Sequence, residues 1–146
     1  MPCFPVITSL RMHTDFDKKK FMHIDHTTLR TEQLEKTRDF LIRVFDLVEG
    51  PRPAVIAENI KGYWLYHKKA PLIHLIESRP YPGTVTGDAV EAIDHTAFFM
   101  EGYDGFRKKL DELNIPYSLM DLPDINERRI FIRTPTKILL ETVFRN

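Results

Sequence analysis

The pattern of apolar and polar positions predicts a helix in the first third of the chain. Leu34, Leu41 and Val48 lie seven residues apart, which is the spacing of an apolar helical stripe. Thr31 precedes two residues suited to a first helical turn and is expected to be the N-cap. The Gly-Pro pair at residues 50–51 is expected to end this helix.

A second helix is predicted by the same kind of pattern in the other half of the chain. Asp104 is a suitable N-cap, and Phe106, Leu110 and Leu113 then share one helical face. Pro116 is expected to end the helix.

Each predicted helix is followed by three short runs that are typical of strands. They cover residues 54–59, 62–67 and 72–77 in the first half and 117–122, 128–134 and 138–144 in the second. The motif Ile24-Asp25-His26-Thr27 also recurs, 69 positions later, as Ile93-Asp94-His95-Thr96. Both halves therefore predict the order strand, helix, strand, strand, strand, which indicates an internal duplication.

The duplication predicts one pseudo-symmetric α+β domain over residues 21–146. Its first module covers 21–79, a linker rich in Pro and Gly covers 80–90, and the second module covers 91–146. Residues 1–20 match neither module and are interpreted as an N-terminal extension, either flexible or an additional edge strand.

Composition narrows the class of protein. The 146 residues contain 21 Lys+Arg and 21 Asp+Glu, and this zero net charge argues against a nucleic-acid binder. Cys3 is the single cysteine, so an internal disulfide is excluded. The sequence has neither an apolar run long enough for a membrane helix nor a signal-peptide pattern. We therefore expect a cytoplasmic protein whose partner is a small molecule, not a nucleic acid or a membrane.

Four residues that can bind metal occupy equivalent positions in the two modules. His26 and His95 lie in the repeated motif, and His74 and Glu141 lie in the last predicted strand of each module. Glu141 stands among apolar residues, where a buried carboxylate needs compensation by an arginine, a route to the surface or a metal ion. Each histidine alone is more typical of a structural residue, but the repeated placement predicts a metal site.

The donor types indicate one divalent ion. Imidazole and carboxylate ligands suit Fe, Ni, Zn, Mn or Co. With His74 as a fourth ligand, an octahedral ion keeps open positions, whereas a tetrahedral zinc site is closed. Asp25 and Asp94 are expected to point to the opposite strand face and to be hydrogen-bonding or surface residues.

The order of elements and the ligand positions resemble the vicinal oxygen chelate superfamily, which includes glyoxalase I, methylmalonyl-CoA epimerase, bleomycin-resistance proteins and extradiol dioxygenases. The resemblance covers about residues 22–146 and is carried by Ile24-Asp25-His26-Thr27-Thr28-Leu29-Arg30, Gly62-Tyr63-Trp64-Leu65-Tyr66, Leu72-Ile73-His74-Leu75, Ile93-Asp94-His95-Thr96-Ala97-Phe98 and Leu140-Glu141. It implies two tandem βαβββ modules that form a curled mixed sheet around a metal-binding cleft.

The resemblance also implies which residues hold the metal. His26, His95 and Glu141 match the positions that the superfamily most often keeps. His74 stands where glyoxalase I typically has Glu and the epimerase has Gln, which puts a strict glyoxalase I activity in doubt. The superfamily often forms dimers, so a homodimer is expected.

Three functions remain open at this point. The preferred one is a glyoxalase-like lyase or isomerase that acts through a metal-stabilised enediolate, with Glu141 or Glu127 as the general base. The alternative is an Fe(II) extradiol-type dioxygenase with His26, His95 and Glu141 as ligands and His74 as an acid/base group. The second alternative is a non-enzymatic binding protein that confers resistance.

Aromatic and basic residues supply candidates for the wall of a substrate site. These candidates are Trp64, Tyr66, Arg52 and Phe99. Alternation along residues 62–67 places Trp64 and Tyr66 on one face and Tyr63 and Leu65 on the other, so one pair is expected to lie in the core.

Overall fold

The computed structural model describes residues 21–78 and 91–145. In chain order the elements are β1 (Met22–Thr31), α2 (Leu34–Phe45), β2 (Val48–Gly50), α3 (Ala54–Asn59), β3 (Gly62–His67), β4 (Ala70–Glu77), β5 (Ala92–Met100), α4 (Tyr103–Glu112), β6 (Tyr117–Leu122), the 3-10 turn η1 (Pro123–Ile125), β7 (Glu127–Arg133) and β8 (Leu139–Arg145). The expected N-terminal extension and linker lie outside the described residues.

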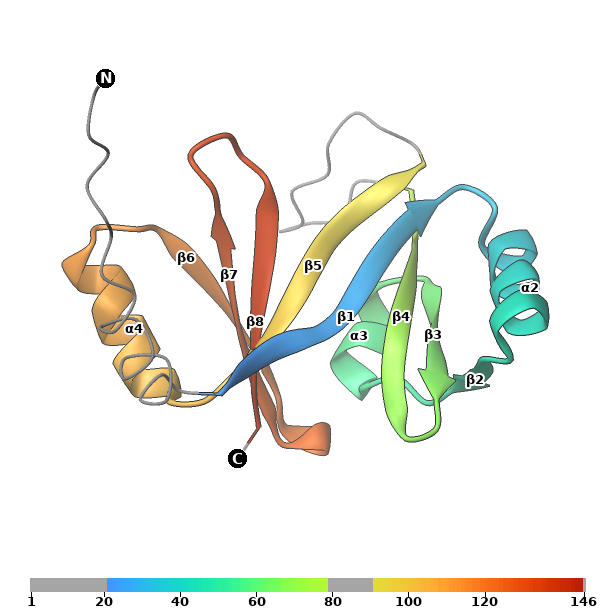
Figure 1. The fold of residues 1–146 in the computed structure, drawn as a ribbon, viewed down its shortest axis with the longest axis horizontal. Coiled ribbons are helices and arrows are strands. Elements are labelled where there is room, and N and C mark those ends of the chain that lie inside the picture. Colours follow the sequence, from blue (N-terminus) through green and yellow to red (C-terminus); the bar gives the residue numbers. More distant parts are fainter. Residues whose placement is uncertain (1–20, 79–90, 146) are drawn as a thin grey trace, which may run out of the picture.

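The strands form one mixed sheet whose two halves have the same order. The sequence of neighbours is β2-β3-β4-β1-β5-β8-β7-β6, with β1 and β5 antiparallel at the centre (Figure 1). Each central strand is parallel to the last strand of its own half, β4 or β8. Read outward from the centre, both halves run first, fourth, third and second strand. This arrangement confirms the α+β sheet built from two similar modules.

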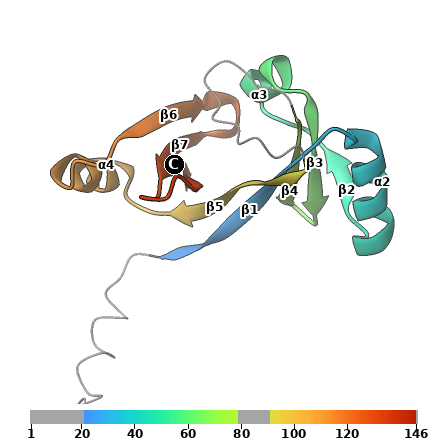
Figure 2. The same ribbon diagram turned by 90° about the horizontal axis from the view of Figure 1, so that it is seen from above.

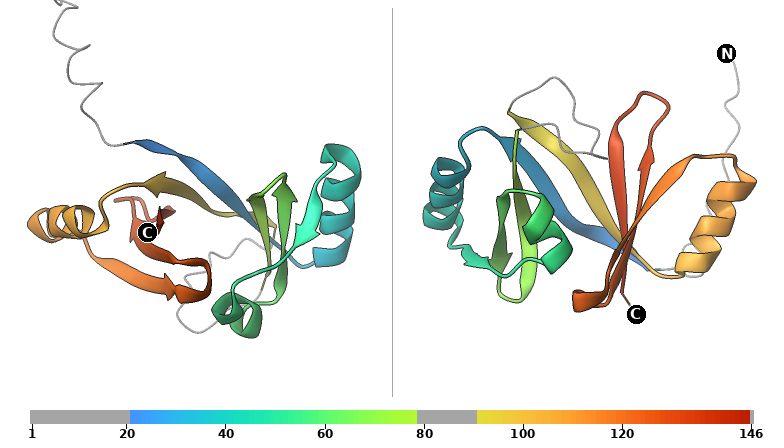
Figure 3. Two further views of the ribbon diagram at one scale, coloured as in Figure 1. Left: turned by 90° about the horizontal axis from the view of Figure 1, so that it is seen from below. Right: turned by 180° about the vertical axis from the view of Figure 1, so that it is seen from behind.

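The sheet curls so that its two halves face each other. Seen from above, α2 and α4 lie outside the curl at opposite ends, and α3 lies at its open side (Figure 2). The views from below and from behind show the same arrangement (Figure 3). Because side chains alternate along a strand, the outer face can pack against the helices while the inner face lines the space inside the curl.

Two apolar clusters fill the space between the sheet and the outer helices. The cluster beneath α2 contains Leu34, Leu41, Leu47, Leu65 and Leu75. The cluster beneath α4 contains Tyr103, Leu110, Ile130 and Phe144. Leu65 is fully buried under α2, whereas the adjacent Trp64 belongs to a third cluster with Ile56 and Leu122. Tyr63 and Leu65 are therefore the pair that packs in the core beneath α2.

Residues 54–59 form a helix, so the predicted strand there is wrong. Pro53 precedes the helix with φ −54°, and its carbonyl accepts hydrogen bonds from the N–H groups of Ile56 and Ala57. Asp124 of η1 accepts a further hydrogen bond from the Ala54 N–H at 2.7 Å. The β-branched residues suggested a strand, but this anchoring and the burial of Ile56 favour a helix that joins the two halves.

The first predicted helix begins and ends at different residues. It starts at Leu34, and Thr31 is the last residue of β1, where its hydroxyl accepts a hydrogen bond from the Gln33 N–H at 3.0 Å. It ends at Phe45 because Asp46 adopts a left-handed conformation with φ 54°. Val48 therefore lies in the edge strand β2.

The second predicted helix also differs at both ends. It runs from Tyr103 to Glu112, so Asp104 lies in its first turn and Gly102, with φ 82°, is the N-cap. Leu110 is buried as expected, but Leu113 is exposed just beyond the helix. The helices in the described part of the chain are all too short or too polar to cross a membrane.

Truncation of Leu75 should test the core beneath α2. Leu75 is 0% exposed and Leu72, three positions earlier on β4, is 44% exposed. We expect Leu75→Ala to lower the free energy of unfolding by about 2–5 kcal/mol, because it leaves a cavity. The matched variant Leu72→Ala should cost less than about 1 kcal/mol. Urea unfolding measures both, and equal losses would contradict this description of the core.

Candidate metal centre

The strand registers explain why the repeat brings its histidines and its carboxylate together. In the central antiparallel pair, His26 of β1 lies opposite Ala97, and His95 of β5 lies opposite Thr28. In the parallel pairs, His74 lies beside Thr28 and Glu141 lies beside Ala97. Each last-strand residue therefore sits beside the position two residues after a repeated histidine. The four sequence candidates are equivalent in the fold.

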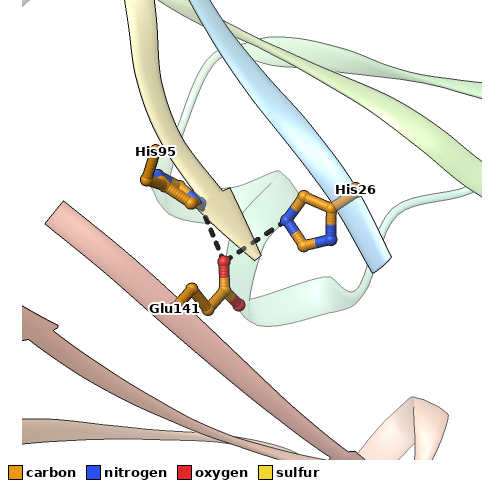
Figure 4. A group of neighbouring side chains, drawn as sticks. All are labelled: His26, His95 and Glu141. Carbon is orange, nitrogen blue, oxygen red and sulfur yellow. Dashed lines mark ion pairs between the residues drawn. The ribbon is translucent and has the colours of Figure 1, made fainter. Parts of the chain in front are cut away.

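Three of these candidates meet at one point inside the curl. His26, His95 and Glu141 each offer one ligand atom, and these atoms lie within 4.8 Å of one another. Oε2 of Glu141 is 3.3 Å from Nε2 of His26 and 2.8 Å from Nε2 of His95 (Figure 4). The side chains of His26 and Glu141 are at most 1% exposed. This group is called the trio below.

An aspartate fixes the orientation of each trio histidine. Oδ2 of Asp25 lies 2.7 Å from Nδ1 of His26, and Oδ2 of Asp94 lies 2.7 Å from Nδ1 of His95. An ionised carboxylate only accepts hydrogen bonds, so each Nδ1 carries a proton. Both aspartates are thus hydrogen-bonding residues, but Asp94 lines the same inner cleft as His95, so its predicted position on the opposite face is wrong. The reason is a register shift at each aspartate, between Ile24 and His26 and between Ile93 and His95. The two Nε2 atoms face Glu141, and that of His95 also lies 3.1 Å from Oγ1 of Thr28.

Arg129 compensates the buried carboxylate of Glu141. Its Nη1 lies 3.0 Å from Oε1 of Glu141, the oxygen that does not face the histidines. Arg129 was not predicted from the sequence to be the partner of Glu141. Arg129 and Phe131 share one face of β7, and Phe131 lies opposite Glu141, but this register is set by the tertiary structure.

The surroundings shift the pKa values of the site in opposite directions. Burial alone would raise the pKa of Glu141, but Arg129 and the two histidines hold it well below its usual range. Burial lowers the pKa of His95, yet hydrogen bonds with Asp94 and Glu141 outweigh this effect and raise it to about 9. Burial, with the added influence of His26 and Arg129, holds the pKa of His74 well below its usual range. At neutral pH, Glu141 is therefore ionised and His74 is neutral.

His74 lies beside the trio in a stack of flat rings. Its ring centroid is 3.7 Å from that of His26 and 3.9 Å from that of Trp64, and the Trp64 and His74 rings are nearly parallel at 8°. Within the described residues, its buried Nε2 has no hydrogen-bond partner. The structure therefore brings His74 next to the trio but does not include it in the set of converging ligand atoms.

A cleft of about 230 Å³ opens from the trio into the inside of the curl. His74, His95, Glu141, Arg129 and Trp64 contribute to its wall. The rest of the wall is mainly apolar and includes Ile56, Ile60, Ile76, Leu119, Met120, Phe131 and Leu139. A wider and more open hollow beside α2 contains none of the trio, so the inner cleft is the candidate site.

The other predicted site residues lie away from this wall. Glu127 is buried at the start of β7 and pairs with Arg129 and Arg145. The Tyr66 hydroxyl donates to the Pro51 carbonyl, and Arg52 donates to the Ile60 carbonyl at 2.7 Å. Phe99 contacts the His23 ring near the start of β1, with centroids 5.0 Å apart. Of the four predicted substrate-binding residues, only Trp64 is among the described residues that line the cleft.

Sequence comparisons identify no relative. No family model matches this chain, and no curated protein matches it.

Solved structures do resemble the fold. Methylmalonyl-CoA epimerase from Mycobacterium tuberculosis matches with a TM-score of 0.64 and 14% identity, over 84% of this chain and 87% of that one. The hypothetical protein BH1468 from Bacillus halodurans C-125 matches with a TM-score of 0.66 and 14% identity, over 87% and 96% of the two chains. The 2,3-dioxygenase LapB from Pseudomonas sp. KL28 matches with a TM-score of 0.61 and 16% identity, over 84% of this chain and 40% of that one. The chain therefore has the same fold as these proteins, which is the fold that the resemblance in its sequence implied.

Proposed function

We propose that the protein is an enzyme that holds one divalent metal ion at His26, His95 and Glu141. The supporting observation is the arrangement of acceptors at the centre of the trio. Each Nδ1 donates its proton to an aspartate, so Nε2 is the ring nitrogen that can bind a metal ion once it is free of a proton. Both Nε2 atoms face the same oxygen of an ionised Glu141, and the raised pKa of His95 places a proton on its Nε2 when no metal is bound. A proton or a metal ion must lie between these groups, because acceptors do not bond to one another.

The charge balance supports the same proposal. Four carboxylates surround the two histidines, and three guanidinium groups pair with them: Asp25 with Arg145, Asp94 with Arg30, and Glu127 and Glu141 with Arg129. One negative charge of this set is left without a guanidinium of its own. Because buried charges interact strongly in a medium of low dielectric constant, a positive charge at the trio is favoured. The proton of His95 supplies it in the metal-free protein, and a metal ion would take its place.

The donor set favours Fe(II) and an oxygenase. Two histidines and one carboxylate are the ligands of non-haem Fe(II) oxygenases, where the metal supplies open positions for dioxygen and substrate. A lyase or isomerase instead needs a general base near the substrate. Glu141 is ionised but bound to Arg129, and Asp94 pairs with His95 and Arg30. Among the residues that the structure describes, no carboxylate lining the cleft is without such partners.

His74 and the apolar wall of the cleft are the groups that would contact a substrate. Neutral His74 has a buried Nε2 that can accept a proton from a substrate hydroxyl, and the rings of Trp64 and His26 hold it in place. A cleft of about 230 Å³ with an apolar wall suits a small, flat and largely apolar molecule.

A glyoxalase-like lyase or isomerase is the second candidate. It is favoured by the likeness to methylmalonyl-CoA epimerase and by His74, which is then the available proton acceptor. Cytoplasmic localisation and a homodimer remain predictions from the sequence.

Metal content tests the ligand set. Protein purified without chelator should hold about one divalent ion per chain, measured by elemental mass spectrometry. His95→Ala and Glu141→Ala should each lose most of this metal, because one of three ligands is missing. His74→Ala should keep it, and His23→Ala, which removes an exposed histidine, is the matched control. Stoichiometric metal in both ligand variants, or none in the wild type, would contradict the proposed site.

Oxygen dependence separates the two candidate reactions. Protein loaded anaerobically with Fe(II) should bind nitric oxide and give the electron paramagnetic resonance signal of a spin-3/2 complex, which requires an open position on the iron. With small ortho-diphenols, the Fe(II) protein should consume oxygen, and the Zn(II) and Ni(II) proteins should not. Oxygen-independent conversion of ketoaldehyde–thiol adducts by the Ni(II) or Zn(II) protein would instead establish the lyase.

The pH dependence of stability tests whether His95 carries a proton at the trio when a chelator has removed the metal. The pKa of His95 rises on folding from 6.5 to about 9, so its stabilisation is complete below pH 6.5 and is lost as the pH rises towards 9. The pKa of Glu141 falls on folding from 4.5, so its stabilisation is lost as the pH falls below 4.5. The pKa of His74 also falls on folding from 6.5, so keeping it neutral costs stability as the pH falls below 6.5. Urea unfolding with a chelator should therefore show highest stability near pH 6.5. An unchanged stability from pH 6.5 to 9 would contradict the assignment.

A further inference from the structure

The trio is part of a larger closed circuit of contacts. Six side chains, called the charge ring, contact one another in the order His26, Asp25, Arg145, Glu127, Arg129 and Glu141, and Glu141 then faces His26. Five of them are at most 8% exposed, and Arg145 is 41% exposed. The ring joins β1 to the start of β7 and to β8.

Glu127 is the member that holds the two arginines in place. Its Oε2 accepts from Arg129 through Nη2 at 2.8 Å and Nε at 3.3 Å. Its Oε1 accepts from Nε of Arg145 at 3.0 Å. Two N–H groups directed at one oxygen fix the plane of the Arg129 guanidinium. Arg129 therefore approaches Glu141 from one set direction.

The fixed orientation of the Arg129 guanidinium determines which oxygen of Glu141 is available to a metal ion. Nη1 of Arg129 forms an ion pair with Oε1 at 3.0 Å, and Oε2 is the oxygen that faces the histidines. On the other side of the ring, Arg145 holds Asp25, which in turn holds Nδ1 of His26. Two chains of contacts thus run from Glu127 to the trio. One passes through Arg129 to Glu141, and the other passes through Arg145 and Asp25 to His26.

We propose that Glu127 is a positioning residue that sets the orientation of two metal ligands, Glu141 through Arg129 and His26 through Arg145 and Asp25. This inference rests on the proposed metal site. It assigns Glu127 a role other than the general base suggested by the sequence, because the carboxylate is engaged by both arginines and does not belong to the described wall of the cleft.

Metal affinity of ring variants tests this role. Glu127→Gln keeps the shape of the side chain but removes its charge, and we expect metal affinity to fall about 10–100-fold, as is typical when the partner of a ligand is lost. Arg145→Gln changes a more exposed member and should weaken binding in the same direction. The matched control is Arg128→Gln, which removes a neighbouring arginine that stacks on Tyr103 at 3.8 Å outside the ring.

Two readouts separate positioning from a purely structural effect. The dissociation constant of Co(II) is measured by competition with a chelator, at a temperature where circular dichroism shows every variant to be folded. The visible absorption of bound Co(II) reports ligand geometry and should change in Glu127→Gln and Arg145→Gln but not in Arg128→Gln. Because the chain of contacts through Arg145 itself depends on Glu127, the double variant should bind metal about as weakly as Glu127→Gln alone.

The outcomes distinguish this inference from the proposed function. Wild-type affinity and an unchanged Co(II) spectrum in both ring variants would overturn the positioning role and leave the metal site standing. If Glu127→Gln does not fold, the same result in Arg145→Gln alone overturns the role. A wild-type protein that binds no Co(II) would overturn the metal site itself.

Discussion

The structure is organised around one buried negative charge, the carboxylate of Glu141. It is 1% exposed and lies on a strand whose neighbouring positions are apolar or core residues. A carboxylate in such surroundings is destabilising unless positive charge and hydrogen bonds compensate it. The chain supplies a guanidinium on one oxygen and two imidazoles on the other. The remaining members of the charge ring in turn hold these groups in position.

Duplication of one module explains how the residues of this centre come together. Each module places a histidine in its first strand and a polar residue in its last, and the antiparallel β1–β5 pair brings both sets to the middle of the sheet. The outer face of each half carries its own apolar cluster under a helix. These outer clusters are separate from the inner face, where the trio and the cleft lie.

The two modules have diverged most where the cleft is built. The first contributes a stacked pair of flat rings, Trp64 and His74, and the helix α3, which packs across to β6. The second contributes Glu141 and the arginine that binds it. A pseudo-symmetric sheet thus holds an asymmetric site, and this asymmetry favours the two-histidine, one-carboxylate set over four equivalent ligands.

The sequence by itself determined the duplicated order of elements, most of the strands and the equivalence of His26, His74, His95 and Glu141, because side-chain alternation and helical periodicity are local properties of the chain. Tertiary structure decided the rest. Residues 54–59 became a helix through contacts with η1 and β6, which lie about 70 positions away. In the folded protein, His74 lies in a stack of rings, Arg129 pairs with Glu141, and Glu127 is buried between two arginines. Such choices depend on which charges and rings meet across the sheet, and local patterns carry no information about partners that are distant in sequence.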